Sequence, residues 1–229
     1  MAHADSPAAL TAFQAAWTHD AYLAADARGM EQCLCGETVP DGAMGSTPAV
    51  LVPLGRVAGR SGLLYTLRST ALNKHAGEVA FPGGNRDAAD ADPLATALRE
   101  TREEVGLRVG RDRLWAALPQ MNSRHDGKPV AAFVADVGEL ELEHLRPEPR
   151  EVEDVFFLSL EHLCRAENVG HTQYRRKDGG AGYSMPVFLN GPHRVWGLTA
   201  ILTHLTLSSL VPEMYSHKPT LLKPIRDGS

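Results

Sequence analysis

The sequence predicts an α/β fold with a helical extension at its N-terminus. Short apolar runs bounded by glycine and proline indicate strands, and they alternate with stretches that carry apolar residues at helical spacing. The extension is predicted from residues 7–28, where Leu10, Phe13 and Trp17 lie three and four positions apart on an alanine-rich background. We therefore expect an amphipathic helix there.

The clearest helix of the main domain is predicted over residues 93–105. Asp92 followed by Pro93 is typical of a helix start, and Gly106 stands where a glycine often ends a helix. Two more helices are expected over residues 160–164 and 198–210, the second from its helical spacing of leucines.

The strands are predicted from short apolar runs that glycine, proline or polar loops interrupt. A segment rich in glycine and proline, 36–48, should separate them from the extension. Strands are expected over residues 49–54, 63–67, 78–81, 114–118, 129–137, 152–158, 182–189 and 193–196.

The composition is that of an ordinary globular protein of 229 residues. Hydrophobic residues make up 43% of the chain, which is enough to build a core. The formal charge of −5 offers no broad basic surface, so no nucleic-acid partner is expected. No apolar run approaches the roughly 18 residues that cross a bilayer, so no membrane partner is expected either. Three cysteines, Cys33, Cys35 and Cys164, are too few for a disulfide framework and favour an intracellular compartment.

Three glutamates on the predicted helix 93–105 are candidates for a functional site. Glu100 and Glu104 are one helical turn apart and Glu103 is three residues from Glu100, so the carboxylates crowd one side. A solvated face laced with ion pairs is the ordinary explanation of such a run. The preceding Phe-Pro-Gly-Gly, which ends at Gly84, favours a metal site instead, because glycines allow close backbone approach and Mg²⁺ prefers oxygen ligands.

This segment resembles the signature of the Nudix hydrolase family, G-x5-E-x7-R-E-U-x-E-E-x-G-U, in which U is apolar. The second half of the signature matches residues 99–107. Three departures occur: fourteen residues instead of thirteen separate Gly84 from Arg99, the Asp90 and Asp92 neighbourhood replaces the upstream glutamate, and Thr101 occupies an apolar position.

The departures are similar to the coenzyme A diphosphatase branch of that family. The branch follows Phe-Pro-Gly-Gly with Arg-Asp, Asp-x-Asp and Thr-Ala-Leu-Arg-Glu, as this chain does up to residue 100. Residues 63–84 look like the second signature of the branch, with Tyr65 in place of the usual leucine and Asn73 in place of the usual arginine. The likeness spans roughly residues 48–210 and includes similarity to a mammalian mitochondrial member.

The resemblance implies a Nudix fold, in which a mixed β-sheet is sandwiched between helices. The implied divisions are an N-terminal helical extension and linker over 1–45, the Nudix domain over 46–211 and a flexible tail over 212–229. The implied reaction cleaves the diphosphate of coenzyme A or acyl-CoA to 3′,5′-ADP and (acyl)phosphopantetheine. Mg²⁺ or Mn²⁺ is the implied cofactor and a small molecule the implied partner. A mitochondrial location follows from the resemblance alone, and a cytoplasmic one is expected otherwise.

Two alternatives to this function stay open from the sequence. One is a Nudix hydrolase of another nucleoside diphosphate derivative, such as NADH or ADP-ribose. The other is a coenzyme A-binding module without turnover, against which the three intact glutamates argue. The sequence leaves the oligomeric state and the number of metal ions open.

Matching positions imply the roles of the site residues. Glu100, Glu103 and Glu104 are the expected metal ligands, with Glu100 as first choice for the general base and Glu103 as a ligand or water-orienting group. Arg99 is expected to pair with one of these carboxylates and fix its rotamer. Glu78 and Glu151 are alternative bases.

The candidates for substrate binding are the cations nearest the two signatures and the glycines of the loop, since a diphosphate needs such donors in an acidic protein. Trp196 is expected in the core, with stacking on adenine as the alternative. The substrate-binding candidates are Arg68, Lys74, Gly83, Gly84 and Arg86.

Overall fold

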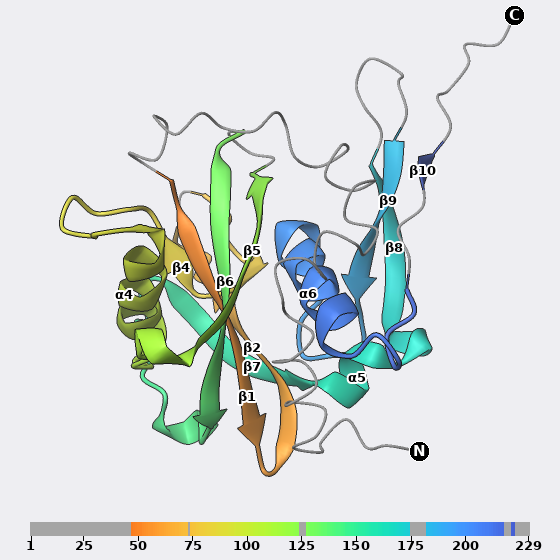
Figure 1. Cartoon of the computed structure of the whole chain (residues 1–229), viewed down its shortest axis with the longest axis horizontal. Helices are drawn as coiled ribbons and strands as arrows, with labels where there is room; N and C mark the ends of the chain where they lie inside the picture. The colour runs from red at the N-terminus through yellow and green to blue at the C-terminus, as the bar shows by residue number, and fades with distance from the viewer. Residues whose placement is uncertain (1–46, 73, 124–126, 175–181, 218–220, 223–229) are drawn as a thin grey trace, which may run out of the picture.

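A seven-stranded mixed sheet lies at the centre of the molecule (Figure 1). The computed structural model describes residues 47–72, 74–123, 127–174, 182–217 and 221–222, so the extension and linker predicted for residues 1–45 lie outside the described part. Among the described residues, no helix has the length and apolar character needed to span a bilayer.

The path through the large sheet is β3-β2-β1-β6-β5, with β4 paired to β1 and β7 paired to β2. Strands β1 and β6 run parallel and the other pairs are antiparallel, so the expected mixed sheet is confirmed. The strands are β1 (Ala49–Val57), β2 (Arg60–Arg68), β3 (Val79–Ala80), β4 (Gly83–Gly84), β5 (Leu114–Asn122), β6 (Pro129–Glu139) and β7 (Val152–Ser159).

Helices cover both faces of this sheet. Helix α4 (Pro93–Val105) lies on one face, where Ala97 packs near Leu51 and Ala131. Helix α6 (Gly197–Leu210) lies on the other face, between the large sheet and a small antiparallel sheet (Figure 1). The small sheet contains β8 (Val169–Tyr174), β9 (Gly182–Phe188) and β10 (Leu221–Leu222), and the short helix α5 (Leu160–Cys164) follows β7.

The main core lies between the large sheet and α6. The ring of Tyr65 stacks on those of Phe81 and Phe156 there, and each of the three side chains is at most 5% exposed. Because α6 is buried, its hydroxyls find partners inside the molecule: the Thr203 hydroxyl donates to the carbonyl of Thr199 on its own helix (2.8 Å) and accepts from the hydroxyl of Tyr65 (3.1 Å). This core fixes α6 across the sheet.

Most predicted elements are confirmed, and two differences bear on the site. The prediction of a strand over residues 193–196 is wrong. Only Val195 pairs there, through two backbone hydrogen bonds with Phe188, before the chain enters α6. Trp196, expected in the core, is 40% exposed. Strand β8 was not predicted, since its sequence lacks the apolar alternation of a typical strand.

Part of the tail expected from residue 212 contacts the domain. Tyr215 is 4% exposed, its hydroxyl lies 3.0 Å from Nδ1 of His204 on α6, and β10 pairs with β9. Burial and, to a smaller degree, the neighbouring His217 lower the pKa of His204 to about 4. The imidazole of His204 therefore stays neutral in the folded protein at neutral pH.

This shift predicts that acid destabilises the protein through His204. The unfolded chain binds a proton at the ordinary pKa near 6.5, so folding loses free energy as the pH falls from about 6.5 towards 4 and loses none above 7. Between pH 7.5 and pH 5, the parent should lose about 2 kcal/mol of unfolding free energy more than His204→Asn, measured by urea unfolding. The matched control His144→Asn removes a 73% exposed histidine and should follow the parent. Parallel curves for the parent and His204→Asn would contradict the assignment.

Candidate metal centre

Helix α4 carries the predicted glutamates, and both of its ends match the sequence signals. The Asp92 carboxylate accepts a hydrogen bond from the backbone N–H of Ala95 (2.8 Å), and Pro93 occupies the first turn. Gly106 has a left-handed conformation (φ 75°) and donates its N–H to the carbonyl of Arg102 (3.0 Å). These caps fix the register of the helix and so the positions of its glutamates.

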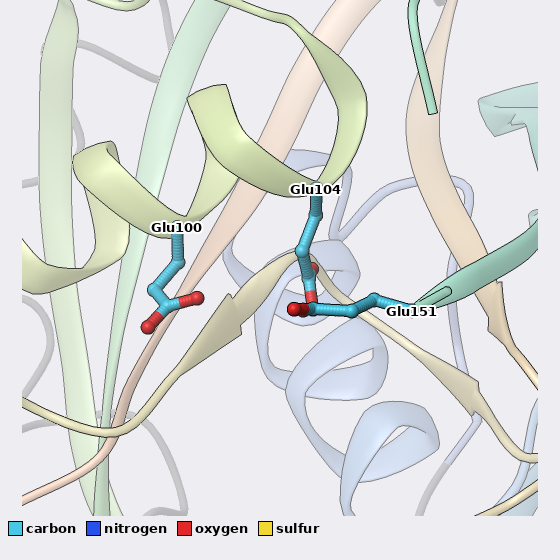
Figure 2. A group of neighbouring side chains, drawn as sticks. All are labelled: Glu100, Glu104 and Glu151. Atoms are coloured by element: carbon cyan, nitrogen blue, oxygen red, sulfur yellow. The ribbon is translucent and has the colours of Figure 1, made fainter. Parts of the chain in front are cut away.

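Three carboxylates meet at one point beside α4. Figure 2 shows Glu100 and Glu104 pointing from α4 and Glu151 reaching them from the segment before β7. One oxygen from each lies within 4.8 Å of the others. Glu104 is 2% exposed, Glu100 is partly buried and Glu151 is exposed. Like charges at such distances repel, so the arrangement is suited to a bound cation.

Backbone hydrogen bonds bring Glu151 to the helix. The N–H of Arg146 donates to the carbonyl of Val105, and the N–H of Glu148 donates to the carbonyl of Glu104, both at 2.9 Å. The carbonyl of Glu151 accepts from Ser69 at the end of β2 (2.9 Å). Sequence reasoning ranked Glu151 only as an alternative base, because these contacts between distant segments leave no local signal.

Burial of Glu104 has strong electrostatic consequences. Its Oε2 accepts the backbone N–H of Gly83 (3.0 Å), and Nη1 of Arg68 lies 3.5 Å from its Oε1. Burial nevertheless raises the pKa of Glu104 to about 7, because the Gly83 hydrogen bond and the Arg68 charge only partly offset the loss of water. Burial also raises the pKa of Glu100, against the opposing effect of Arg99.

The two glycines of the loop lie against the carboxylates. A Cβ on Gly84 would lie 2.5 Å from the carboxylate carbon of Glu100, and a Cβ on Gly83 would lie 2.3 Å from the carbonyl oxygen of Ala49. Gly83 has a φ of 156°, which side-chain-bearing residues rarely adopt. The loop and the helix therefore meet at one place, as the sequence predicts, and any larger residue would displace Glu100 or the loop.

Arg99 ties the loop to the helix. Its Nε and Nη2 donate to the two oxygens of Asp90 (3.0 and 2.9 Å), and its guanidinium also contacts Glu100 and Glu103 at 2.9 Å each. Arg99 thus contacts two of the three glutamates of the helix. This guanidinium holds the pKa of Asp90 well below its usual range. The sequence did not predict the pairing of Arg99 with Asp90, nor its hydrogen bond to the carbonyl of Asn85 (3.0 Å).

The structure places Glu103 apart from the three-carboxylate group. Its side chain is 49% exposed and pairs with Arg99, four residues earlier on the same helix. The carboxylate of Glu103, expected to be a metal ligand, faces solvent in this arrangement and is outside the group of Glu100, Glu104 and Glu151. Glu78, the other alternative base, pairs with His75 (2.8 Å) and is also outside the group.

The predicted substrate cations occupy different environments. Arg68 lies beside Glu104, and its Nε is buried without a hydrogen-bond partner among the described residues. Arg86 donates to the carbonyls of Asp90 and Ala91 and so braces the loop. Lys74 is exposed in the connection between β2 and β3. Of the three, Arg68 is brought to the carboxylates.

The residues of the group fit a divalent cation. All three donors are carboxylate oxygens, which hard ions such as Mg²⁺ and Mn²⁺ prefer. Glu104 is held in place from two sides, and burial raises the pKa of both Glu100 and Glu104, so a bound cation would favour their charged forms. Among the described residues, no other group of three acidic, histidine or cysteine side chains has comparable metal-binding geometry.

The family model and the similar proteins that match this chain agree with one another. The model of the NUDIX domain matches residues 45–177. The chain is 45% identical over 206 residues to "Mitochondrial coenzyme A diphosphatase NUDT8" of Mus musculus, covering 90% of this chain and 96% of the relative. It is 47% identical to the Homo sapiens protein of the same name, covering 80% and 77%. It is also 32% identical to "Nudix hydrolase 3" of Caenorhabditis elegans, covering 78% and 79%.

The raised pKa of Glu104 predicts an unusual pH dependence of the metal-free protein. The unfolded chain releases this proton near pH 4.5 and the folded chain near 7, so folding loses free energy as the pH rises through this range. In EDTA at pH 8, Glu104→Gln should be more stable than the parent by about 2 to 3 kcal/mol in chemical unfolding, and this advantage should vanish at pH 4.5. Glu103→Gln is the matched control on the same helix and should lack the effect. The assignment would be refuted if the difference in unfolding free energy between Glu104→Gln and the parent were the same at pH 8 and pH 4.5.

Proposed function

The chain belongs to the Nudix family, and on that premise we propose that it hydrolyses the diphosphate of coenzyme A or acyl-CoA to 3′,5′-ADP and (acyl)phosphopantetheine. The observation that carries the proposal is the meeting of Glu100, Glu104 and Glu151 beside the Gly83–Gly84 loop. The choice of substrate is supported by two relatives that are 45% and 47% identical and are named coenzyme A diphosphatases.

Nudix hydrolases need a divalent metal, and in the proposal Glu100 and Glu104 hold Mg²⁺ or Mn²⁺, with the carboxylate of Glu151 next to them. When bound, such an ion draws off the negative charge that develops on the diphosphate oxygens. Gly83 and Arg68 keep Glu104 in one rotamer from opposite sides. Arg99 does the same for Glu100, and its contacts with Asp90 hold the loop beside the helix.

The general base of the proposal is Glu151. A base must accept a proton from the attacking water, so its carboxylate has to be accessible. Glu151 is exposed and has no ion pair among the described residues, whereas Glu100 is partly buried and pairs with Arg99. The geometry thus favours Glu151 over Glu100, the first choice from the sequence. The oxygen of the water joins one phosphorus, the bond from that phosphorus to the bridging oxygen breaks, and the water proton goes to Glu151.

The proposal also covers the cations that bind the substrate and the location of the protein. Arg68 lies beside Glu104 and is the best placed of the predicted substrate cations, followed by Lys74; in the described part of the chain the Nε of Arg68 has no hydrogen-bond partner. Arg86 and Glu103 act on the loop and on Arg99 rather than on the substrate. A mitochondrial location is proposed from the names of the two mammalian relatives and is tested by fractionation of cells that produce the protein.

Coenzyme A incubated with purified protein and Mg²⁺ should yield 3′,5′-ADP, detected by liquid chromatography. NADH and ADP-ribose in the same panel should give much lower values of kcat/KM. Faster cleavage of either would remove the substrate assignment and leave the diphosphate hydrolase. Absence of turnover on every substrate, with retained binding of coenzyme A, would favour a binding module.

Substitution of Glu151 and Glu104 by glutamine should separate the base from the metal ligand. Loss of a general base lowers kcat by about 10²- to 10⁴-fold, so Glu151→Gln should show this loss while its Mn²⁺ affinity changes by less than about tenfold. Glu104→Gln should lose Mn²⁺ affinity, measured by isothermal titration. Glu153→Gln, an exposed neighbour on β7, is the control and should keep the parent kcat. A Glu151→Gln enzyme with parental kcat would transfer the role of base to another group.

A further inference from the structure

A short segment, residues 193–199, crosses the end of β2 and is fixed on both sides of it. Nε2 of His193 lies 2.8 Å from Oδ2 of Asp154 on β7, and the hydroxyl of Thr199 donates to the carbonyl of Val79 on β3 (2.9 Å). Asp154 and Val79 are the two partners of Leu67 in the sheet. Because neighbouring strands are about 4.8 Å apart, the two anchors are about 10 Å apart, with Leu67 between them.

The crossing segment and the carboxylates lie at the same end of β2. Arg68 follows Leu67 directly, and its guanidinium contacts Glu104. Arg68 is paired with Val152, the residue after Glu151, and the next residue of the chain, Ser69, donates its N–H to the Glu151 carbonyl. The segment leads into α6 and so lies on the face of the sheet opposite α4, and a substrate whose diphosphate lies at the carboxylates reaches it by passing round the end of β2.

Two side chains of this segment point outward together. Val195 is fully buried and bridges Phe188, and in an extended chain its neighbours Arg194 and Trp196 lie on the opposite side. Trp196 is 40% exposed, and the Arg194 guanidinium carbon lies 5.5 Å from the centre of its ring. Within the described part of the chain, Arg194 has no carboxylate partner although the protein is acidic. Met214 is the only other large apolar side chain as exposed among the described residues.

We propose that Trp196 and Arg194 bind the nucleotide half of the diphosphate substrate. An exposed indole offers a flat surface on which a purine ring stacks, and a guanidinium without a carboxylate partner pairs with phosphate oxygens. The nucleotide half of coenzyme A has both a purine ring and a 3′-phosphate, whereas its pantetheine half has neither. The inference takes its substrate from the proposed function. It places the nucleotide half of that substrate at Trp196 and Arg194, which the carboxylates alone do not do.

The test measures binding of the two products separately, so that it does not depend on turnover. Trp196→Ala should weaken the affinity for 3′,5′-ADP about 10-fold or more and leave the affinity for phosphopantetheine within about twofold, by isothermal titration. Trp196→Phe keeps a stacking ring and should stay within about threefold of the parent. Arg194→Ala should weaken 3′,5′-ADP more than adenosine, which has no phosphate. In coenzyme A hydrolysis, the Trp196→Ala loss should appear mainly in KM.

Met214→Ala is the matched control, since it removes the other exposed apolar side chain, and it should bind 3′,5′-ADP like the parent. Parental affinity of Trp196→Ala for 3′,5′-ADP would overturn the proposal, and so would a loss confined to phosphopantetheine. Thermal unfolding checks that each variant folds, and Arg194→Ala carries the test if Trp196→Ala does not fold, since equal effects of Arg194→Ala on 3′,5′-ADP and adenosine would overturn the proposal. If neither the parent nor any variant hydrolyses coenzyme A, the proposed function fails. Selective loss of 3′,5′-ADP binding in the Trp196 and Arg194 variants would still support the nucleotide site.

Discussion

The site depends on a carboxylate that the fold holds almost entirely out of water. Glu104 is buried beneath the glycine loop, with the N–H of Gly83 on one oxygen and the Arg68 guanidinium near the other. Two such contacts do not replace the lost hydration, so the charged form stays costly until a cation arrives. Glu100 and Glu151 sharpen this demand by adding like charges nearby. The repulsion among these carboxylates and their partial loss of hydration therefore favour the binding of a metal ion at this point.

Local signals in the sequence were sufficient for helix α4 and its neighbourhood. Asp92, Pro93 and Gly106 act through contacts within a few residues, so the helix ends could be predicted from their types alone. Spacing was less informative about which carboxylates converge. Successive helical residues turn by about 100°, so Glu103 and Glu104 diverge by that angle although both follow Glu100. Packing buries Glu104 and leaves Glu103 to pair with Arg99 in solvent.

The parts of the site that the sequence did not reveal come from contacts between distant segments. Glu151 reaches the helix only because the preceding loop bonds to the last turn of α4, and Trp196 is exposed only because Val195 takes the buried side of its segment. Both residues lie in short irregular stretches, where neither helical nor strand periodicity assigns a face. A tryptophan in such a stretch is ordinarily expected inside.

The loop that delivers Glu151 is attached through its main chain. The N–H groups of Arg146 and Glu148 bond to carbonyls at the end of α4, and the side chains of the loop take no part in those two bonds. Amino-acid type is therefore a weak constraint on this stretch, but length is a strict one: adding or deleting a single residue between Glu148 and Glu151 would move the third carboxylate by up to about 3.5 Å. Relatives that share this chemistry should accordingly tolerate many replacements in the loop while keeping its number of residues. The exposed side chains of the loop could likewise be changed by design as long as its length is kept.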